Sequence, residues 1–240
     1  IPIKLHIDSI QILNGYIAIN ETSPRTGFKS NISFHSLNGL VTNFTNFPQQ
    51  DRSSDIIELN ASTLVYNKAF TQLNMKFDLN SKLDEFTASG EVDTVDMINF
   101  NPVLEPMMAV KVTDGQLHNL KFTFTGMDTL STGTLDMDYS NAKLEVHNKD
   151  TAVSNNKKGF LSFAANTIIK TNNNPNKSGY IQGVISTDRV LNKDVWPFLW
   201  HSVQSGIIST MAPITNNKET KQIQKQRRQA LKEERKEDKD

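Results

Sequence analysis

Side chains that could perform catalysis or bind a metal are scattered along this sequence. Two spacings that place metal ligands on one helix face, His-x-x-x-His and Glu-x-x-His, are absent from the five histidines, which are His6, His35, His118, His147 and His201. His6 and His118 fall at polar positions of alternating segments, which is typical of surface histidines. We therefore predict no metal site.

Acidic and hydroxyl side chains also give no catalytic arrangement. Asp136 and Asp138 lie two residues apart, so they share one face of a strand. Catalytic acid pairs work in a cleft with a hydrophobic wall, whereas this pair is typical of the solvated face of a hairpin. The chain has no cysteine, no Gly-x-Ser-x-Gly and no phosphate-binding glycine loop. We predict a protein that is not an enzyme, has no catalytic residues and needs no cofactor.

Composition limits the size of the core and the kind of partner. Only 37% of the 240 residues are hydrophobic, below the roughly 45–50% of an average globular protein. Lys+Arg and Asp+Glu both total 26, and zero net charge disfavours a nucleic-acid partner because phosphates need clustered positive charge. We predict a shallow or extended architecture, or a polar segment that dilutes the average.

Four segments, at residues 3–7, 73–79, 120–124 and 135–139, alternate between hydrophobic and polar residues with period two. Such a pattern predicts strands with one apolar and one wet face, as in an antiparallel sheet that is covered on one side. The apolar face must be shielded from water, either because the sheet closes or folds over on itself or because the face holds lipid. Its large, adaptable side chains are the candidate lipid-contacting residues: Leu73, Met75, Phe77, Leu120, Phe122, Phe124, Leu135, Met137 and Tyr139.

Glycine, asparagine and aspartate separate the apolar runs. Asn14-Gly15 and Asp114-Gly115 favour the positive φ angles of tight turns, so we predict hairpin turns at both places. Residues 21–27, 47–54 and 148–158 are predicted to be longer loops, and residues 172–177 a further exposed turn. Together these features predict a β domain over residues 1–192.

Two helices interrupt or follow the strands. Asp93 or Thr94 can cap a short helix over about 94–108, with Pro102 and Pro106 near the start of its turns. A second helix over 193–213 begins near Asp194 and carries one apolar stripe of residues Trp196, Leu199, Trp200, Val203 and Ile207. This amphipathic helix either caps the last strand or contacts a membrane or partner. Residues 214–240 are a polar, charged tail, helical or disordered.

The hairpin patterns resemble a known family. Residues 99–146 contain an Asn-Pro-x-Leu helix, a strand, the Asp114-Gly115 pair and a Gly-x-Leu strand, and residues 7–17 repeat a strand, Asn-Gly, strand unit. These motifs, with the aromatic helix at 196–206, resemble the C-terminal region of AsmA-like proteins, the group that includes TamB and YhdP relatives. The resemblance implies a curved, U-shaped β-groove that carries phospholipid between membranes.

The same resemblance implies a location and a set of partners. It implies a periplasmic protein of Gram-negative bacteria, anchored to the inner membrane by an N-terminal helix absent from this chain, with a role in outer-membrane biogenesis. Its partners would be phospholipid or another lipid, a membrane surface or envelope-assembly proteins. The alternative is a structural or adhesive β module that binds protein or glycan through loops such as residues 47–54.

Overall fold

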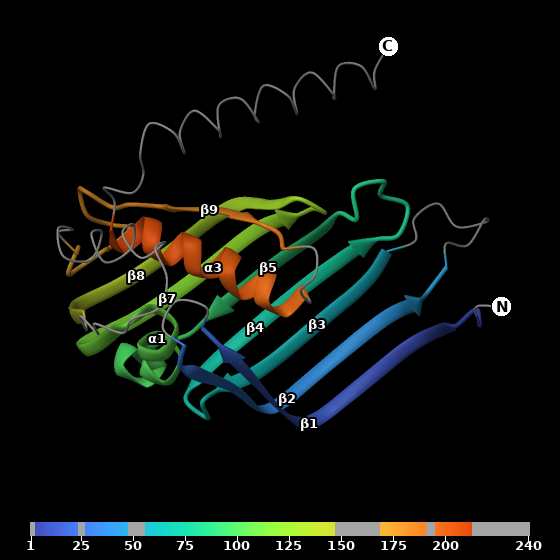
Figure 1. Cartoon of the computed structure of the whole chain (residues 1–240), viewed down its shortest axis with the longest axis horizontal. Coiled ribbons are helices and arrows are strands. Elements are labelled where there is room, and N and C mark those ends of the chain that lie inside the picture. Colours follow the sequence, from blue (N-terminus) through green and yellow to red (C-terminus); the bar gives the residue numbers. More distant parts are fainter. Residues whose placement is uncertain (1–2, 24–26, 48–55, 147–168, 191–194, 213–240) are drawn as a thin grey trace, which may run out of the picture.

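The strands of this protein form a single antiparallel sheet, seen in a computed structural model that describes residues 3–23, 27–47, 56–146, 169–190 and 195–212 (Figure 1). The strands are β1 (His6–Thr22), β2 (Lys29–Thr45), β3 (Ile56–Val65), β4 (Ala69–Asp78), β5 (Phe86–Val92), β6 (Val95–Asp96), β7 (Val110–Gly126), β8 (Leu130–Val146) and β9 (Gly183–Asp188). The helices are the 3-10 helix η1 (Met97–Phe100), α1 (Asn101–Met108) and α3 (Val195–Met211).

Sheet order follows chain order. The strands run β1-β2-β3-β4-β5-β7-β8-β9, every pair is antiparallel, and the two-residue β6 pairs with β7 beside β5. β1 and β9 lie at opposite edges, so the nine-stranded sheet is not closed. The prediction of a mainly β, antiparallel fold with a short internal helix and a C-terminal helix is confirmed.

The predicted hairpin turns at Asn14-Gly15 and Asp114-Gly115 are wrong. Both pairs lie inside 17-residue strands, β1 and β7, where the register shifts. The positive φ angles are real, 49° at Asn14 and 138° at Gly115, but they form β-bulges. A bulge bends a strand and reverses the alternation of its side chains. Ile12 and Ile17, which are five residues apart, therefore line the same cavity.

The internal helix begins later than predicted. Val95 and Asp96 pair with β7, and the Thr94 hydroxyl donates to the carbonyl of His118, so neither Asp93 nor Thr94 caps the helix. Strand pairing with β7 holds this segment extended for two more residues than the capping pattern indicates. Pro102 lies at the start of α1 as predicted, whereas Pro106 lies inside it.

The segment 172–177 is only partly the exposed turn that its composition predicts. Asn173 is fully buried, and its backbone forms an antiparallel bridge with Tyr139 of β8. Its side chain donates to the carbonyls of Met137 and Ile181 and accepts from the Ile181 amide. An asparagine side chain can thus replace missing strand hydrogen bonds and hold a chain segment against a sheet. Residues 48–54 of the predicted loop 47–54, the predicted loop 148–158, Asp194 and the tail from 214 lie outside the described residues.

Candidate apolar binding site

A continuous row of cross-strand neighbours crosses the whole sheet, and part of this row forms the base of the site. We call it the Phe122 row, and its members in order are Ile12, Gly39, Ala61, Leu73, Gly90, Phe122, Leu135 and Gly183. Small residues are interspersed with large ones in this row, and the small residues Gly39 and Ala61 are direct neighbours on β2 and β3. Because small side chains leave space above the sheet, the row is hollowed there.

A second row lies beside the first and is also apolar at its surface. This Leu120 row consists of Thr63, Thr71, Val92, Leu120 and Met137. The hydroxyl of Thr63 donates to the carbonyl of His35, and that of Thr71 donates to the carbonyl of Ala69. Since the local backbone satisfies both hydroxyls, these threonines add little polarity to the site.

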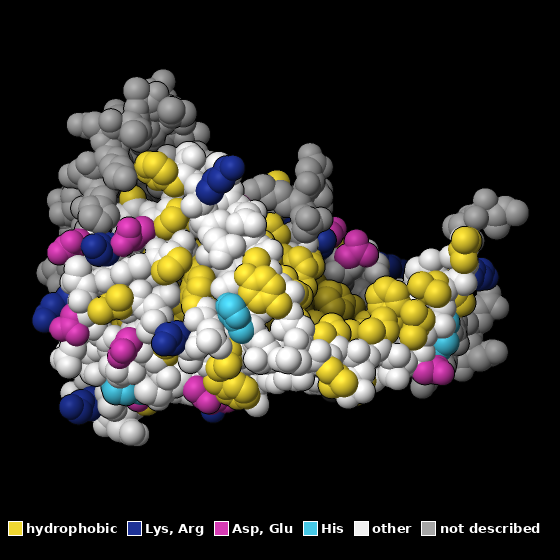
Figure 2. Space-filling model, turned by 90° about the horizontal axis from the view of Figure 1, so that it is seen from below, with side chains coloured by type: hydrophobic (Ala, Val, Ile, Leu, Met, Phe, Trp, Pro, Cys, Tyr) yellow, Lys and Arg dark blue, Asp and Glu magenta, His cyan; other side chains and the backbone are white. Residues whose placement is uncertain are grey.

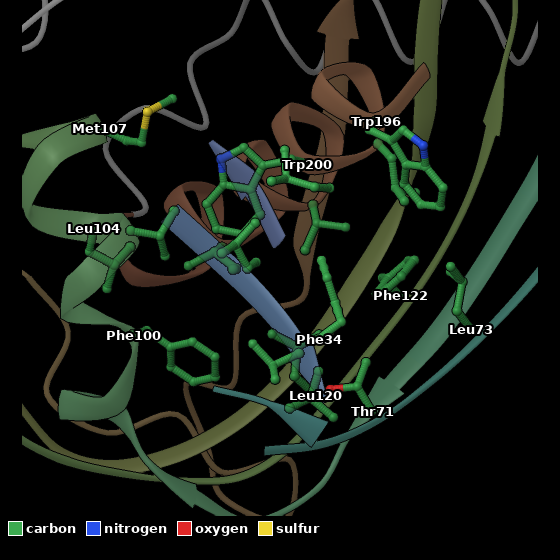
Figure 3. Close-up of a pocket in the computed structure, with 18 of the residues that line it drawn as sticks. Phe34, Thr71, Leu73, Phe100, Leu104, Met107, Leu120, Phe122, Trp196 and Trp200 are labelled. Carbon is green, nitrogen blue, oxygen red and sulfur yellow. The ribbon is translucent and has the colours of Figure 1, made fainter. Parts of the chain in front are cut away.

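Two helices cover the rows and enclose a cavity of about 720 Å³. η1 contributes Phe100, α1 contributes Val103, Leu104 and Met107, and α3 contributes its apolar stripe. In Figure 3 the labelled side chains of both helices gather over Phe34, Leu120 and Phe122. Figure 2 shows the hollow lined by hydrophobic side chains that continue along one arm of the molecule. The volume falls within the range of about 300–1,000 Å³ that is usual for ligand sites.

The shape of the cavity wall depends on glycines that face aromatic rings. Gly90 pairs with Phe122, and a Cβ on Gly90 would lie 2.5 Å from the Phe122 ring. Gly126 pairs with Phe86 in the same way, and a Cβ on Gly126 would lie 2.4 Å from the Phe86 ring. Each ring lies across the neighbouring strand because the glycine there has no side chain. The Phe122 ring is thereby held low against the sheet, and the space above it stays open.

The apolar face of the sheet is divided between this cavity and a packed core. Of the nine candidate lipid-contacting residues, four line the cavity: Leu73, Leu120, Phe122 and Met137. Met75, Phe124, Leu135 and Tyr139 are at most 2% exposed, and Phe77 is half-buried and stacks on Phe86. Gly206 of α3 lies directly over Leu135, and Phe198 contacts Phe86. One end of the face is therefore a protein core, and only the rest can hold a ligand.

All five residues of the α3 stripe face the cavity. Trp196, Leu199, Trp200, Val203 and Ile207 line it, and Trp196 is also 42% exposed at its rim. The helix contacts the sheet through its other side, on which Phe198, Ser202, Gly206 and Ser209 are buried. The stripe that the sequence singles out is therefore a cavity wall, and the less apolar side makes the contact with the sheet.

Serines of α3 complete the hydrogen bonding of the last strand. The amide of Val184 donates to Ser209 Oγ at 2.7 Å, and the amide of Ser186 donates to Ser205 Oγ at 3.1 Å. Four residues of a helix and two of a strand both span about 6–7 Å, so the two spacings match. The helix thus covers the edge of β9 as a further strand would.

Removing the Ser209 hydroxyl tests whether these hydrogen bonds between β9 and α3 stabilise the protein. In Ser209→Ala the Val184 amide loses its acceptor at a position that is 9% exposed, which costs about 1–2 kcal/mol. We expect the Tm to fall by roughly 2–8 °C in calorimetry. Ser205→Ala, which removes the longer bond from a half-buried position, should have a smaller effect. Equal stability of Ser209→Ala and the parent protein would show that the hydrogen bond from Val184 to Ser209 contributes nothing to stability.

Charged groups lie mainly on the other face of the sheet. Lys76 pairs with Glu58 and Lys121 with Glu91, at 3.7 Å and 3.1 Å. Hydrogen bonds from Asn74 and Asn60 lower the pKa of Glu58, and a bond from Asn119 lowers the pKa of Glu91. Among the described residues that line the cavity, Glu21 is the only charged one. The cavity itself is therefore almost free of charge.

The remaining candidates for chemistry do not come together. Asp136, predicted to face solvent, accepts hydrogen bonds from the Tyr180 hydroxyl at 2.6 Å and from Gln182. Burial, and then the bond to Asp136, raise the pKa of Tyr180. Four histidines lie apart on different elements, His147 lies outside the described residues, and no three metal-binding side chains cluster within the described ranges. We assign no chemistry to these groups.

Several cavity residues were missed by the sequence analysis. Phe100, Val103, Leu104 and Met107 recur at intervals of three and four, which is an amphipathic helix pattern. That pattern could have identified α1 as a cavity wall. Ile17, Ile32 and Phe34 on β1 and β2 also line the cavity. The bulges interrupt the alternation of these strands, so no simple pattern marked them as one face.

Comparison with known proteins gives no match among family models, curated proteins or solved structures. None of the described helices combines the length and the apolar character that crossing a membrane requires. The functional argument is therefore made from the fold and from the cavity.

Proposed function

We propose that this protein is a non-enzymatic lipid-binding domain that holds acyl chains of phospholipid or another lipid in the cavity between the sheet, α1 and α3. The observation that carries the proposal is an apolar cavity of about 720 Å³ with one charged residue among its described lining. Water gains few hydrogen bonds in such a space, and engineered apolar cavities of about 150 Å³ stay dry or bind apolar molecules.

The energetics favour a chain-like ligand. Each methylene that moves from water to an apolar site contributes about 0.8 kcal/mol. The helices that cover the cavity and the sheet beneath it supply adaptable side chains, including Met107, Met137 and two tryptophans. Such side chains suit a ligand that changes conformation. A cavity of this kind stabilises an acyl chain without polar contacts, so the lipid needs no specific head group to bind.

The cellular role forms part of the same proposal. The hairpin motifs and the bulged, open sheet support a place among AsmA-like proteins, with the sheet acting as a U-shaped groove. In that role the protein would act in the periplasm, tethered to the inner membrane, and would take part in lipid transport during outer-membrane biogenesis. The alternative, an adhesive module that binds through loops, requires a closed apolar interior, and the cavity favours the lipid hypothesis over it.

Intrinsic fluorescence gives a direct test, because the only two tryptophans of the chain are Trp196 and Trp200 and both line the cavity. The protein is first freed of lipid, and native mass spectrometry before this step should show bound lipid. Acyl chains that carry bromine, a contact quencher, should then reduce tryptophan emission. Trp196→Phe and Trp200→Phe, each with one remaining tryptophan, should both still be quenched. No bound lipid and no quenching in either variant would contradict the proposal.

A further inference from the structure

The two ends of the cavity differ in their exposure to water. At one end Trp196 is 42% exposed, and Leu73 on the same side is half-buried. At the other end Val103 and Met107 of α1 are only 3% and 6% exposed. In Figure 3 Trp196 and Leu73 lie on one side, Met107 lies on the opposite side, and Trp200 lies between them. The cavity is therefore open beside Trp196 and closed at α1.

Contacts on two sides hold the closed end in place. Val103, Met107 and Val110 belong to one buried apolar cluster, and Trp200 of α3 packs against it. Ser23, which is buried directly after β1, donates its hydroxyl to the backbone carbonyl of Met107 at 3.4 Å. The end of α1 is thus attached to both α3 and β1, so it forms a fixed wall across the cavity.

This difference sets the direction in which a lipid chain enters. The α1 residues Val103, Leu104 and Met107 present apolar side chains to the cavity, so a methyl group can lie against them without breaking a hydrogen bond. A phosphate or ester group at the same place would lose its hydration. At the open end water still reaches the head group, and the ring and N–H of Trp196 suit a boundary between apolar and aqueous surroundings.

We propose, on the basis of the lipid-binding function above, that the cavity takes a single acyl chain with its methyl end first, and that Leu104 and Met107 of α1 limit the length of that chain. The head group stays in water beside Trp196. Each methylene up to α1 adds to the affinity, whereas methylenes beyond this limit find no apolar space.

Bromine at two depths tests the direction of the chain. Lysophosphatidylcholines that carry bromine either near the ester or near the methyl end are added to Trp196→Phe and Trp200→Phe, each of which keeps one tryptophan. The two indoles are four residues apart on α3, which is about 6 Å along its axis. Bromine near the ester should quench Trp196 more strongly than Trp200, and bromine near the methyl end should do the reverse. The opposite order, or one order for both bromine positions, would overturn the proposed direction.

A series of chain lengths tests the limit set by α1. Unlabelled lysophosphatidylcholines, kept below their micelle concentrations, displace a brominated chain from the parent protein and its variants. In the parent protein the affinity should rise about fourfold per methylene and then level off. Met107→Ala should move this limit to chains longer by about two methylenes, because the truncation leaves space beyond Cβ. Leu104→Phe should move it to chains shorter by about one methylene.

Met75→Ala is the matched control for the truncation. Met75 is 1% exposed in the packed core and lies outside the cavity lining. This variant should lose stability but keep the chain-length limit of the parent protein. If Met107→Ala does not fold, Leu104→Phe still decides, because Leu104 is half-buried and the added ring points at the cavity. A limit that stays unchanged in the folded α1 variants would remove α1 from the selection of chain length.

The two proposals fail in different ways. If no lysophosphatidylcholine quenches tryptophan emission or displaces the brominated chain, the lipid-binding function itself is wrong. If these ligands bind but the α1 variants leave the length limit unchanged, lipid binding stands, and the assignment of α1 as the closed end is wrong.

Discussion

Replacing Ala61 with phenylalanine is expected to weaken acyl-chain binding by roughly 50-fold while the protein stays folded. Ala61 is half-buried in the Phe122 row, between Gly39 and Leu73, and it lines the cavity. A phenyl ring at this position would occupy the hollow directly. If the ring displaces about three methylenes of the ligand at about 0.8 kcal/mol each, the loss is about 2.4 kcal/mol.

The stability of Ala61→Phe should stay the same or rise, although its affinity for acyl chains falls. Filling an apolar cavity with apolar atoms is neutral or stabilising when the ring has room. Ser62→Phe is a matched control, because the neighbouring residue of the same strand points to the opposite face of the sheet. Titration of both variants with a brominated acyl chain, together with thermal unfolding, separates the two effects. Unchanged affinity in a folded Ala61→Phe protein would show that the ligand lies elsewhere.

The second large effect is expected at Gly206, where α3 packs closely on the sheet. A Cβ at this position would lie 2.8 Å from Leu135 Cβ and 2.9 Å from Ile185 Cγ1, both in the packed core. The facing residue is also a glycine, since a Cβ on Gly183 would meet the Gly206 carbonyl oxygen. Leu135 and Ile185 cannot move aside cheaply, because both side chains are fully buried in the core.

Gly206→Val should therefore destabilise the protein by about 2–3 kcal/mol and lower its Tm by roughly 4–12 °C. Because α3 carries both tryptophans, loosening of the helix should also shift their emission to longer wavelength before the sheet unfolds. Gln204→Val places the same side chain at a half-exposed position of α3 and should change the Tm little. A Gly206→Val protein as stable as this control would mean that α3 does not pack closely on the sheet.

Substitutions at Gly206 and at Ala61 are expected to affect stability and lipid binding differently. A valine at Gly206 displaces α3, which covers the cavity, and so lowers stability and lipid binding together. A phenylalanine at Ala61 fills the space and lowers binding alone. The pair of variants therefore distinguishes a cavity that binds lipid from a gap between elements that has no function.

Local periodicity identified most of the elements. The alternation around Leu73, Phe122 and Met137 predicted strands with one apolar face, and the structure has them in one open antiparallel sheet. The stripe that includes Trp196, Trp200 and Ile207 predicted the C-terminal helix, which spans Val195–Met211. These predictions succeed because each depends on a few neighbouring residues, whose side chains point in directions set by the backbone period.

Turn chemistry was less informative than periodicity. Asn14-Gly15 and Asp114-Gly115 predicted the correct backbone angles but the wrong structures, because a hairpin turn and a bulge both use a positive φ. The choice between them depends on the neighbouring strand, which continues to pair on both sides of each bulge. That information is not contained in the dipeptide.

By itself, the sequence determined the antiparallel strands, both helices and the apolar face of the sheet. Only the tertiary structure decided which part of that face is core and which part is cavity. Leu135 and Leu73 have the same local pattern, but Gly206 covers the first while Ala61 and Gly90 flank the second. The physical reason is that space above a sheet depends on side chains brought together across eight strands and on where two helices lie, which are long-range contacts that no local pattern records.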